Sequence, residues 1–172
     1  ILCQVSLNHN IPLIKENYYN FKKIYGSVKI FVICPKRQIK EFKKKLNFEG
    51  INIINEDNIF PFNDFNKIFL ELSKKVSYQK KFSKRLKWYY QQILKISFAF
   101  DFIKKNKNLI IWDADTIILN KIEFFKKDNS INYGNFYENN KDYYLTNKNI
   151  LKFFPRYNIS FLNQFISICK KD

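Results

Sequence analysis

Hydrophobic residues in the first third of the chain form short runs that alternate with amphipathic segments. Three runs are apolar enough for buried strands, at residues 1–8, 28–35 and 50–57. The segments between them, residues 11–26 and 38–46, have helical spacing, and Gly26 closes the first of them. Strands separated by helices of this length are typical of right-handed crossovers within a parallel sheet.

The middle of the chain has the periodicity of two helices, at residues 62–76 and from about 82 to 105. In the second helix, large apolar side chains recur at the helical period and predict a stripe that faces the core: Leu86, Tyr89, Tyr90, Ile93, Ile96 and Phe100. Residues 108–112, Asn-Leu-Ile-Ile-Trp, then predict a fourth strand. Because its apolar run is continuous, we expect it to be an inner strand buried on both faces.

Beyond residue 125 the pattern is weaker. It indicates a strand at 131–137, a helical turn at 147–154 and a last helix at 159–171. Together the elements predict one α/β domain over residues 1–172, with a mainly parallel central sheet flanked by helices. The chain begins with a strand-like run and contains no Met, so we expect that one or both ends have been trimmed.

Two aspartates directly follow the fourth strand, in the segment Trp112-Asp113-Ala114-Asp115-Thr116. Residues two apart in extended chain point to the same side, and open parallel sheets bind ligands at the carboxyl ends of their strands. Asp113 and Asp115 therefore predict a site for Mg²⁺ or Mn²⁺ bound together with a diphosphate, since these ions prefer carboxylate and phosphate oxygens. The alternative is a simple turn or helix cap, in which Asp is also common.

A second polar pattern lies on the long predicted helix, where Trp88, Gln91, Gln92 and Lys95 share one face. Amides beside a Trp indicate the wall of a cleft that binds polar groups, and Lys95 could reach a phosphate. The alternative is an ordinary amphipathic helix, with the Trp packed in the core and the Gln side chains solvated.

The chain resembles a group of bacterial proteins classed as glycosyltransferases, most of whose individual reactions are unassigned. These carry an acidic pair after a strand, then a W-Y-x-Q-Q-x-x-K helix, then a strand that ends in D-x-D-T. Here the matching residues are Glu56-Asp57, Trp88 to Lys95, and Asp113 to Thr116, in the same order and over roughly residues 1–125. The resemblance implies the GT-A fold, a Rossmann-like sheet that binds a nucleotide sugar, with Asp113 and Asp115 as its metal pair.

The implied reaction is sugar transfer from a nucleoside diphosphate donor, expected to be a uridine one, to a glycan or lipid-linked acceptor in surface polysaccharide synthesis. Many GT-A enzymes supply a further metal ligand, often His, after the D-x-D, whereas the only His here is His9, far upstream. An inactive relative that binds a nucleotide or glycan is therefore an alternative. A metal-dependent nuclease or phosphatase is less favoured, because that class places more Asp, Glu or His near strand ends.

The net charge of +16 also permits a basic nucleic-acid-binding module. Arginines are few, and the abundance of Lys, Asn, Ile and Phe matches A/T-rich codons, so we expect no nucleic-acid partner. The charge could instead favour peripheral contact with an anionic membrane. Three distant cysteines, Cys3, Cys34 and Cys169, indicate reduced thiols and a cytoplasmic location, and no apolar run approaches the length of a membrane span.

Two further residues are candidates for nucleotide-sugar binding. His9 follows the first strand, in Ser-Leu-Asn-His-Asn, where a nucleotide base or ribose is commonly contacted. Arg85 precedes the helix that carries the W-Y-x-Q-Q-x-x-K pattern at Trp88 to Lys95, here named the signature helix, and could pair with a diphosphate. A surface role is the alternative for each. For an acceptor-side base, nothing in the sequence distinguishes among Asp128, Glu138 and Asp142.

Overall fold

A five-stranded sheet forms the centre of the molecule in the computed structural model, which describes residues 1–74, 85–105, 108–126 and 165–169. The strands lie in the order β3-β2-β1-β4-β5. Their bounds are β1 Leu2–Val5, β2 Ile30–Cys34, β3 Ile51–Asn55, β4 Asn108–Trp112 and β5 Phe165–Cys169. The first four are parallel, and β5 pairs antiparallel with β4. The predicted mainly parallel α/β fold is confirmed, with β4 as an inner strand.

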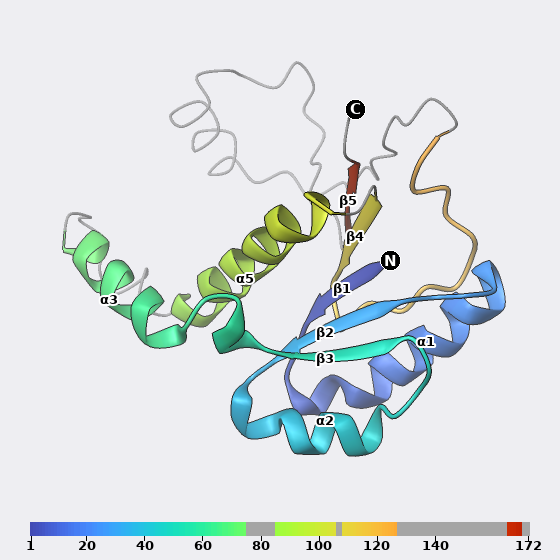
Figure 1. Ribbon diagram of the computed structural model, residues 1–172, viewed down its shortest axis with the longest axis horizontal. Coiled ribbons are helices and arrows are strands. Elements are labelled where there is room, and N and C mark those ends of the chain that lie inside the picture. Colours follow the sequence, from blue (N-terminus) through green and yellow to red (C-terminus); the bar gives the residue numbers. More distant parts are fainter. Residues whose placement is uncertain (75–84, 106–107, 127–164, 170–172) are drawn as a thin grey trace.

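Helices cover both faces of this sheet (Figure 1). One face carries α1 Ile11–Tyr25 and α2 Ile39–Lys45, and the other carries α3 Phe62–Ser73 and α5 Leu86–Ile103. Gly26 ends α1 with a φ of 81°, a conformation that glycine adopts without steric cost. In the part of the chain that the structure describes, none of the helices has the length and apolar content needed to cross a bilayer.

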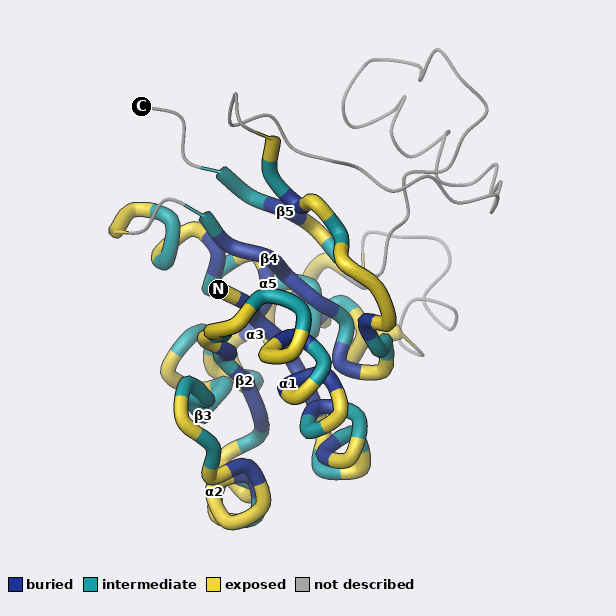
Figure 2. The backbone as a smooth tube through the Cα atoms, turned by 90° about the vertical axis from the view of Figure 1, so that its right-hand side faces the viewer, coloured by how far each residue is buried: buried dark blue, intermediate teal, exposed yellow. Residues whose placement is uncertain are grey.

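Strand alternation divides the core into two clusters, one on each face of the sheet. On one face, Leu2, Ile110 and Trp112 pack against α1 and α2. On the other, Cys3, Leu109 and Ile111 pack with the buried side chains of α3 and α5. Nearly every residue of the inner strands β1, β2 and β4 is accordingly buried, while the outer surfaces of the helices are exposed (Figure 2). This two-sided burial explains the continuous apolar runs of β2 and β4.

The predicted core stripe of α5 is only partly right. Tyr90 is buried, and Leu86, Tyr89 and Ile93 pack at the edge of the α3/α5 cluster. Ile96 and Phe100, however, are 51% and 67% exposed, while Leu94, Lys95 and Ala99 occupy the buried face. Apolar residues line nearly the whole circumference of this helix, so its periodicity does not by itself distinguish the inward from the outward face.

The helix predicted over residues 159–171 is wrong for the five residues described there, because Phe165–Cys169 is β5. A short apolar run cannot be assigned to helix or strand from its period alone. Pairing with β4 satisfies backbone donors and acceptors that β4 would otherwise leave open on that edge. The ring of Phe165 also stacks on Trp112 at 5.6 Å between centroids. The elements predicted at 131–137 and 147–154 lie outside the described residues.

Candidate functional site

A cleft of about 750 Å³ opens at the carboxyl ends of the parallel strands. From β1 the chain adds β2 and β3 on one side of the sheet and then returns to add β4 on the other side of β1. The strand order therefore reverses between β1 and β4. Ligands of open α/β sheets bind at such a reversal. The lining comes from α5 and from the segments that follow each of the four parallel strands. It includes Trp88 and Gln91 of α5, Ser6, Leu7 and His9 after β1, Lys36 and Arg37 after β2, Glu56 and Asp57 after β3, and Asp115 after β4.

The two aspartates after β4 lie in a turn rather than in extended chain. The backbone N–H of Thr116 donates to the carbonyl of Asp113 at 3.1 Å, which closes the turn. Alternation along a strand therefore does not describe this segment, although Asp115 does reach the cleft and is exposed there. Ala114 between them is buried against the α1 side of the sheet, which accounts for the small residue at this position.

Asp113 is held by a lysine from α5. The Nζ of Lys95 lies 2.5 Å from Oδ1 of Asp113, and the side chains are 9% and 31% exposed. Sequence reasoning grouped both residues with the site but did not pair them. An ammonium so well shielded from water needs an opposite charge beside it. The ion pair thus joins the signature helix directly to the aspartate turn.

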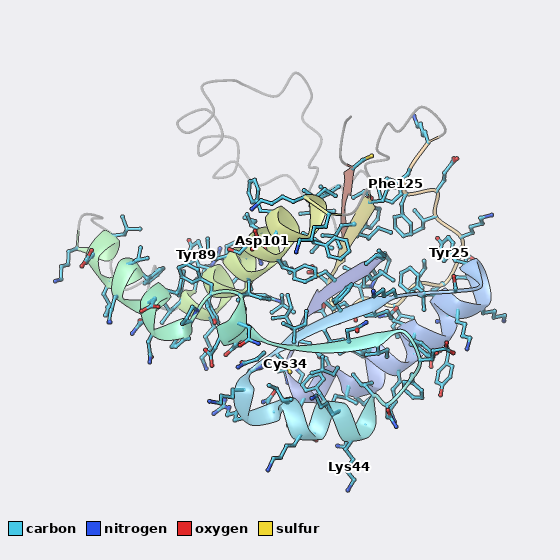
Figure 3. All side chains as sticks on the ribbon, in the orientation of Figure 1. Tyr25, Cys34, Lys44, Tyr89, Asp101 and Phe125 are labelled. Atoms are coloured by element: carbon cyan, nitrogen blue, oxygen red, sulfur yellow. The ribbon has the colours of Figure 1, made fainter. Side chains whose placement is uncertain are left out.

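The turn is also fixed from the other face of the sheet, by polar side chains of α1. Asn17, fully buried, donates through Nδ2 to the carbonyl of Thr116 at 2.6 Å and accepts from the N–H of Ile118 at 3.0 Å. Further along, Tyr25 exchanges two 2.8 Å hydrogen bonds with the backbone of Ile122. Figure 3 shows Tyr25 at the end of α1, beside the segment that carries Phe125. The chain after β4 therefore has little freedom.

The amino-terminal half of α5 forms one wall of the cleft. Tyr90 anchors it by donating from its hydroxyl to the carbonyl of Phe60 at 2.7 Å. The Nε2 of Gln91 donates to the carbonyl of Val5 at 3.3 Å, which attaches the helix to the end of β1. Trp88, 45% exposed, lines the same wall and is not packed in the core. Gln91 thus has a structural bond as well as a place in the lining.

The acidic pair lines the same cleft, in the 3-10 turn Glu56–Asn58 that follows β3. Burial raises the pKa of the Glu56 carboxyl, and the neighbouring charge of Asp57 raises it further, against a smaller opposing effect of Arg37. Burial and the same two carboxylates also raise the pKa of the Tyr90 hydroxyl. The cleft therefore contains a half-buried acidic group next to a neutral phenol.

Three basic side chains in the lining were not singled out from the sequence, namely Lys36, Arg37 and Lys87. Lys36 and Arg37 directly follow Pro35 at the end of β2, and this position was the signal that could have identified them. A basic pair at this position was not distinctive in a chain with so many lysines. His9 lies in the 3-10 turn Asn8–Asn10, which follows β1, and it is exposed at the cleft.

Some predicted residues lie away from the cleft lining. Arg85 is exposed in the turn just before α5, and Gln92 is half-buried on the helix without reaching the cleft. The candidate acceptor-side residues Asp128, Glu138 and Asp142 lie outside the described part of the chain. Cys3 and Cys34 are buried free thiols, as expected, and burial raises the pKa of the Cys34 thiol to about 12. Cys169 is only partly buried.

The donor set fits a metal ion that brings other ligands with it. Within the described residues, no three His, Cys, Asp or Glu side chains are grouped so as to hold a metal alone. Asp115 and Asp113 offer carboxylate oxygens from one turn, and Oδ1 of Asp113 is bound by Lys95. Mg²⁺ characteristically binds through one or two carboxylates and completes its shell with water and substrate phosphates. Mg²⁺ or Mn²⁺ is therefore compatible with this turn when a phosphate ligand accompanies it.

Fold and cleft define the class of protein: an α/β domain with a cleft at the carboxyl edge of a mostly parallel sheet. By sequence the chain belongs to a family of unknown function, DUF6492, whose model matches residues 12–163. That match includes all of α1 but its first residue, the acidic pair, the signature helix and the aspartate turn. No curated protein and no solved structure matches the chain.

Proposed function

We propose that the protein is a glycosyltransferase that moves a sugar from a nucleoside diphosphate donor, such as a UDP-sugar, to a glycan or lipid-linked acceptor. One observation carries the proposal. Three polar motifs that are far apart in the sequence contribute to the lining of a single cleft, through Glu56 and Asp57, Trp88 and Gln91, and Asp115. These are the motifs on which the resemblance to bacterial glycosyltransferases rests.

The cleft has suitable chemistry for a nucleotide sugar. Its volume of about 750 Å³ is in the range of small-molecule sites. Trp88 offers an aromatic surface, and Lys36, Arg37 and Lys87 offer positive charge for an anionic ligand. Asp113 and Asp115 would hold Mg²⁺ or Mn²⁺, which as a Lewis acid would neutralise the departing diphosphate. Lys95 adds a cation at the same turn.

The acceptor side of the proposal draws on the outer surface of α5. Ile96 and Phe100 lie one helical turn apart and expose 51% and 67% of their surface. Lys104 and Lys105 follow at the end of the helix, and the whole chain carries a net charge of +16. Exposed apolar side chains with lysines beside them are suited to the surface of an anionic bilayer. We therefore favour a lipid-linked acceptor, used on the cytoplasmic side of a bacterial membrane.

Donor hydrolysis tests the function. Purified protein is incubated with a panel of nucleotide sugars and Mn²⁺, with and without cell-envelope extract, and free nucleoside diphosphate is measured. We expect release from at least one donor and loss of release in the double variant Asp113→Asn, Asp115→Asn. Asp101→Asn is the matched control, because Asp101 is an exposed aspartate on α5 outside the cleft. Release that persists in the double variant would show that these aspartates are not the site.

A binding domain without turnover is the second candidate. The observation that favours it is the bond between Lys95 and Asp113, which already neutralises one of the two proposed metal ligands. This candidate predicts that nucleoside diphosphates or glycans raise the unfolding temperature while no donor is consumed. A transferase shows both binding and release, so the same preparation distinguishes the two.

A further inference from the structure

Lys95 is an unusual residue in this domain. Among the described residues it is the only charged side chain that is buried, with 7% of the residue exposed. It extends from the inner face of α5 to the turn after β4, where its Nζ contacts Oδ1 of Asp113. Desolvating an ammonium costs more than one surface ion pair returns, so a buried lysine indicates a demand beyond stability.

The other described lysine–aspartate pair on the same helix provides the contrast. Lys104 and Asp101 are one turn apart and 2.8 Å apart, but their side chains are 69% and 82% exposed. Such an exposed pair contributes little to stability, and neither of its charges lies in the cleft lining. Lys95 instead neutralises Asp113, which shares its turn with Asp115, a residue of the cleft lining.

We propose that Lys95 is a competing cation, which occupies Asp113 until a diphosphate and a divalent metal arrive together. This inference rests on the proposed function. When both ligands bind, the ammonium transfers its contact from Asp113 to a phosphate oxygen, and the carboxylate becomes available to the metal. Lys95 is thus a residue that couples the two binding events.

Charge balance explains why neither ligand would bind well alone. At the turn itself, Asp113 and Asp115 carry one negative charge more than Lys95 balances. A diphosphate that reaches the turn without metal therefore meets repulsion there, although Lys36, Arg37 and Lys87 attract it elsewhere in the cleft. A divalent ion without diphosphate must displace, or lie beside, a shielded ammonium, and like charges in a partly buried site repel strongly. When both are bound, the positive charge of the metal and the negative charge of the diphosphate largely cancel. The ammonium of Lys95 can then remain at the turn without strong repulsion.

The experiment measures Mn²⁺ binding by calorimetry and by the electron paramagnetic resonance signal of free Mn²⁺, neither of which depends on turnover. Parent, Lys95→Met, Lys95→Gln and the control Lys67→Met, at an exposed lysine of α3 that pairs with Asp64, are each titrated with Mn²⁺ alone, and again with saturating UDP or GDP. Circular dichroism melts establish that each variant is folded. Two different neutral replacements are included because Met removes every polar contact to Asp113, whereas Gln preserves one.

We expect the parent to bind Mn²⁺ alone weakly and to gain about tenfold or more in affinity with the nucleoside diphosphate, as one removed charge repulsion allows. Either Lys95 variant should bind Mn²⁺ alone about tenfold more tightly than the parent, with a reduced effect of the nucleotide. Lys67→Met should behave like the parent. Adding Asp113→Asn to Lys95→Met should abolish the gain.

Several outcomes would overturn the inference. Equal Mn²⁺ affinity of parent and Lys95 variants without nucleotide would show that the ammonium does not compete, and so would no Mn²⁺ binding by any of them. A parent whose Mn²⁺ affinity is unchanged by nucleotide lacks the proposed coupling, whatever the variants do. If no nucleoside diphosphate binds under any condition, the proposed function fails and the coupling fails with it, while the titrations with Mn²⁺ alone still decide whether Lys95 competes with the metal.

Discussion

The Nδ2 group of Asn17, on α1, donates a 2.6 Å hydrogen bond to the backbone carbonyl of Thr116, on the opposite side of β4 from the signature helix. The same side chain accepts from the N–H of Ile118. Trp112 also donates to the Thr116 carbonyl, at 2.7 Å, from the strand itself. The aspartate turn is therefore held from both faces of the sheet, by Asn17 on one and Lys95 on the other.

Replacing Asn17 with Leu should lower the free energy of unfolding by about 1–3 kcal/mol, because the buried N–H of Ile118 loses its acceptor. The carbonyl of Thr116 retains the bond from Trp112 and contributes less to the loss. Urea denaturation measures the change, with Asn47→Leu, at an exposed asparagine, as the control. Equal stability of Asn17→Leu and the parent would contradict this account of the turn.

The two aspartates should differ in their effect on stability. Asp113→Asn leaves the shielded ammonium of Lys95 opposite a neutral amide, and should cost about 1–3 kcal/mol, less than for a fully buried pair because Asp113 is partly exposed. Asp115 is exposed, so Asp115→Asn should change stability by no more than about 0.5 kcal/mol. Adding Lys95→Met to Asp113→Asn should recover part of the loss. The parent, Asp113→Asn, Lys95→Met and the variant with both changes form a double-mutant cycle, and chemical denaturation measures the stability of each. Additive effects on stability would exclude a coupling between Lys95 and Asp113.

Glu56 should give a pH-dependent contribution to stability. Its pKa is raised, chiefly by burial and then by Asp57, so folding disfavours its carboxylate form. The stability that the neutral acid provides is fully present below the ordinary pKa and is lost as pH rises through the raised pKa. Glu56→Gln should therefore melt at a higher temperature than the parent near neutral pH, and the gain should vanish below about pH 4.

Melting temperatures across this pH range measure the difference. Glu49→Gln, at an exposed glutamate outside the cleft, is the matched control and should show no comparable trend. A Glu56→Gln variant less stable than the parent at neutral pH would mean that the carboxylate is required for folding.

The exposed apolar surface of α5 should contribute to membrane contact. Replacing Phe100 with Ser should weaken sedimentation with vesicles rich in phosphatidylglycerol by about tenfold, the effect of withdrawing one large apolar side chain from a bilayer interface. Stability should change little, because the side chain is 67% exposed. Leu119→Ser, which alters another exposed apolar residue away from α5, is the control. Equal loss in both variants, or no loss in either, would remove this surface from the proposal.

The local pattern of apolar and polar residues was sufficient to predict much of this fold. Four strands and four helices of the first 112 residues lie close to their predicted positions, because strands buried on both faces and amphipathic helices leave distinct periods in the sequence. Their alternation also predicted a mainly parallel sheet, since crossover connections have one dominant hand. The failures were local signals that fit two structures equally well. Phe165–Cys169 became a strand only because β4 had an open edge, and α5 is apolar almost all around.

The candidate site divides in the same way. The sequence by itself determined that Asp113, Asp115, Glu56 and Asp57 follow strands, and parallel strands bring their carboxyl ends to one edge. It did not determine which partners those side chains meet, since such contacts depend on how a helix is rotated and on backbone turns. Only the tertiary structure placed Lys95 against Asp113 and Asn17 beneath Thr116, across 18 and 99 residues of chain. Burial in the folded core makes these polar contacts strong, and no sequence period encodes them.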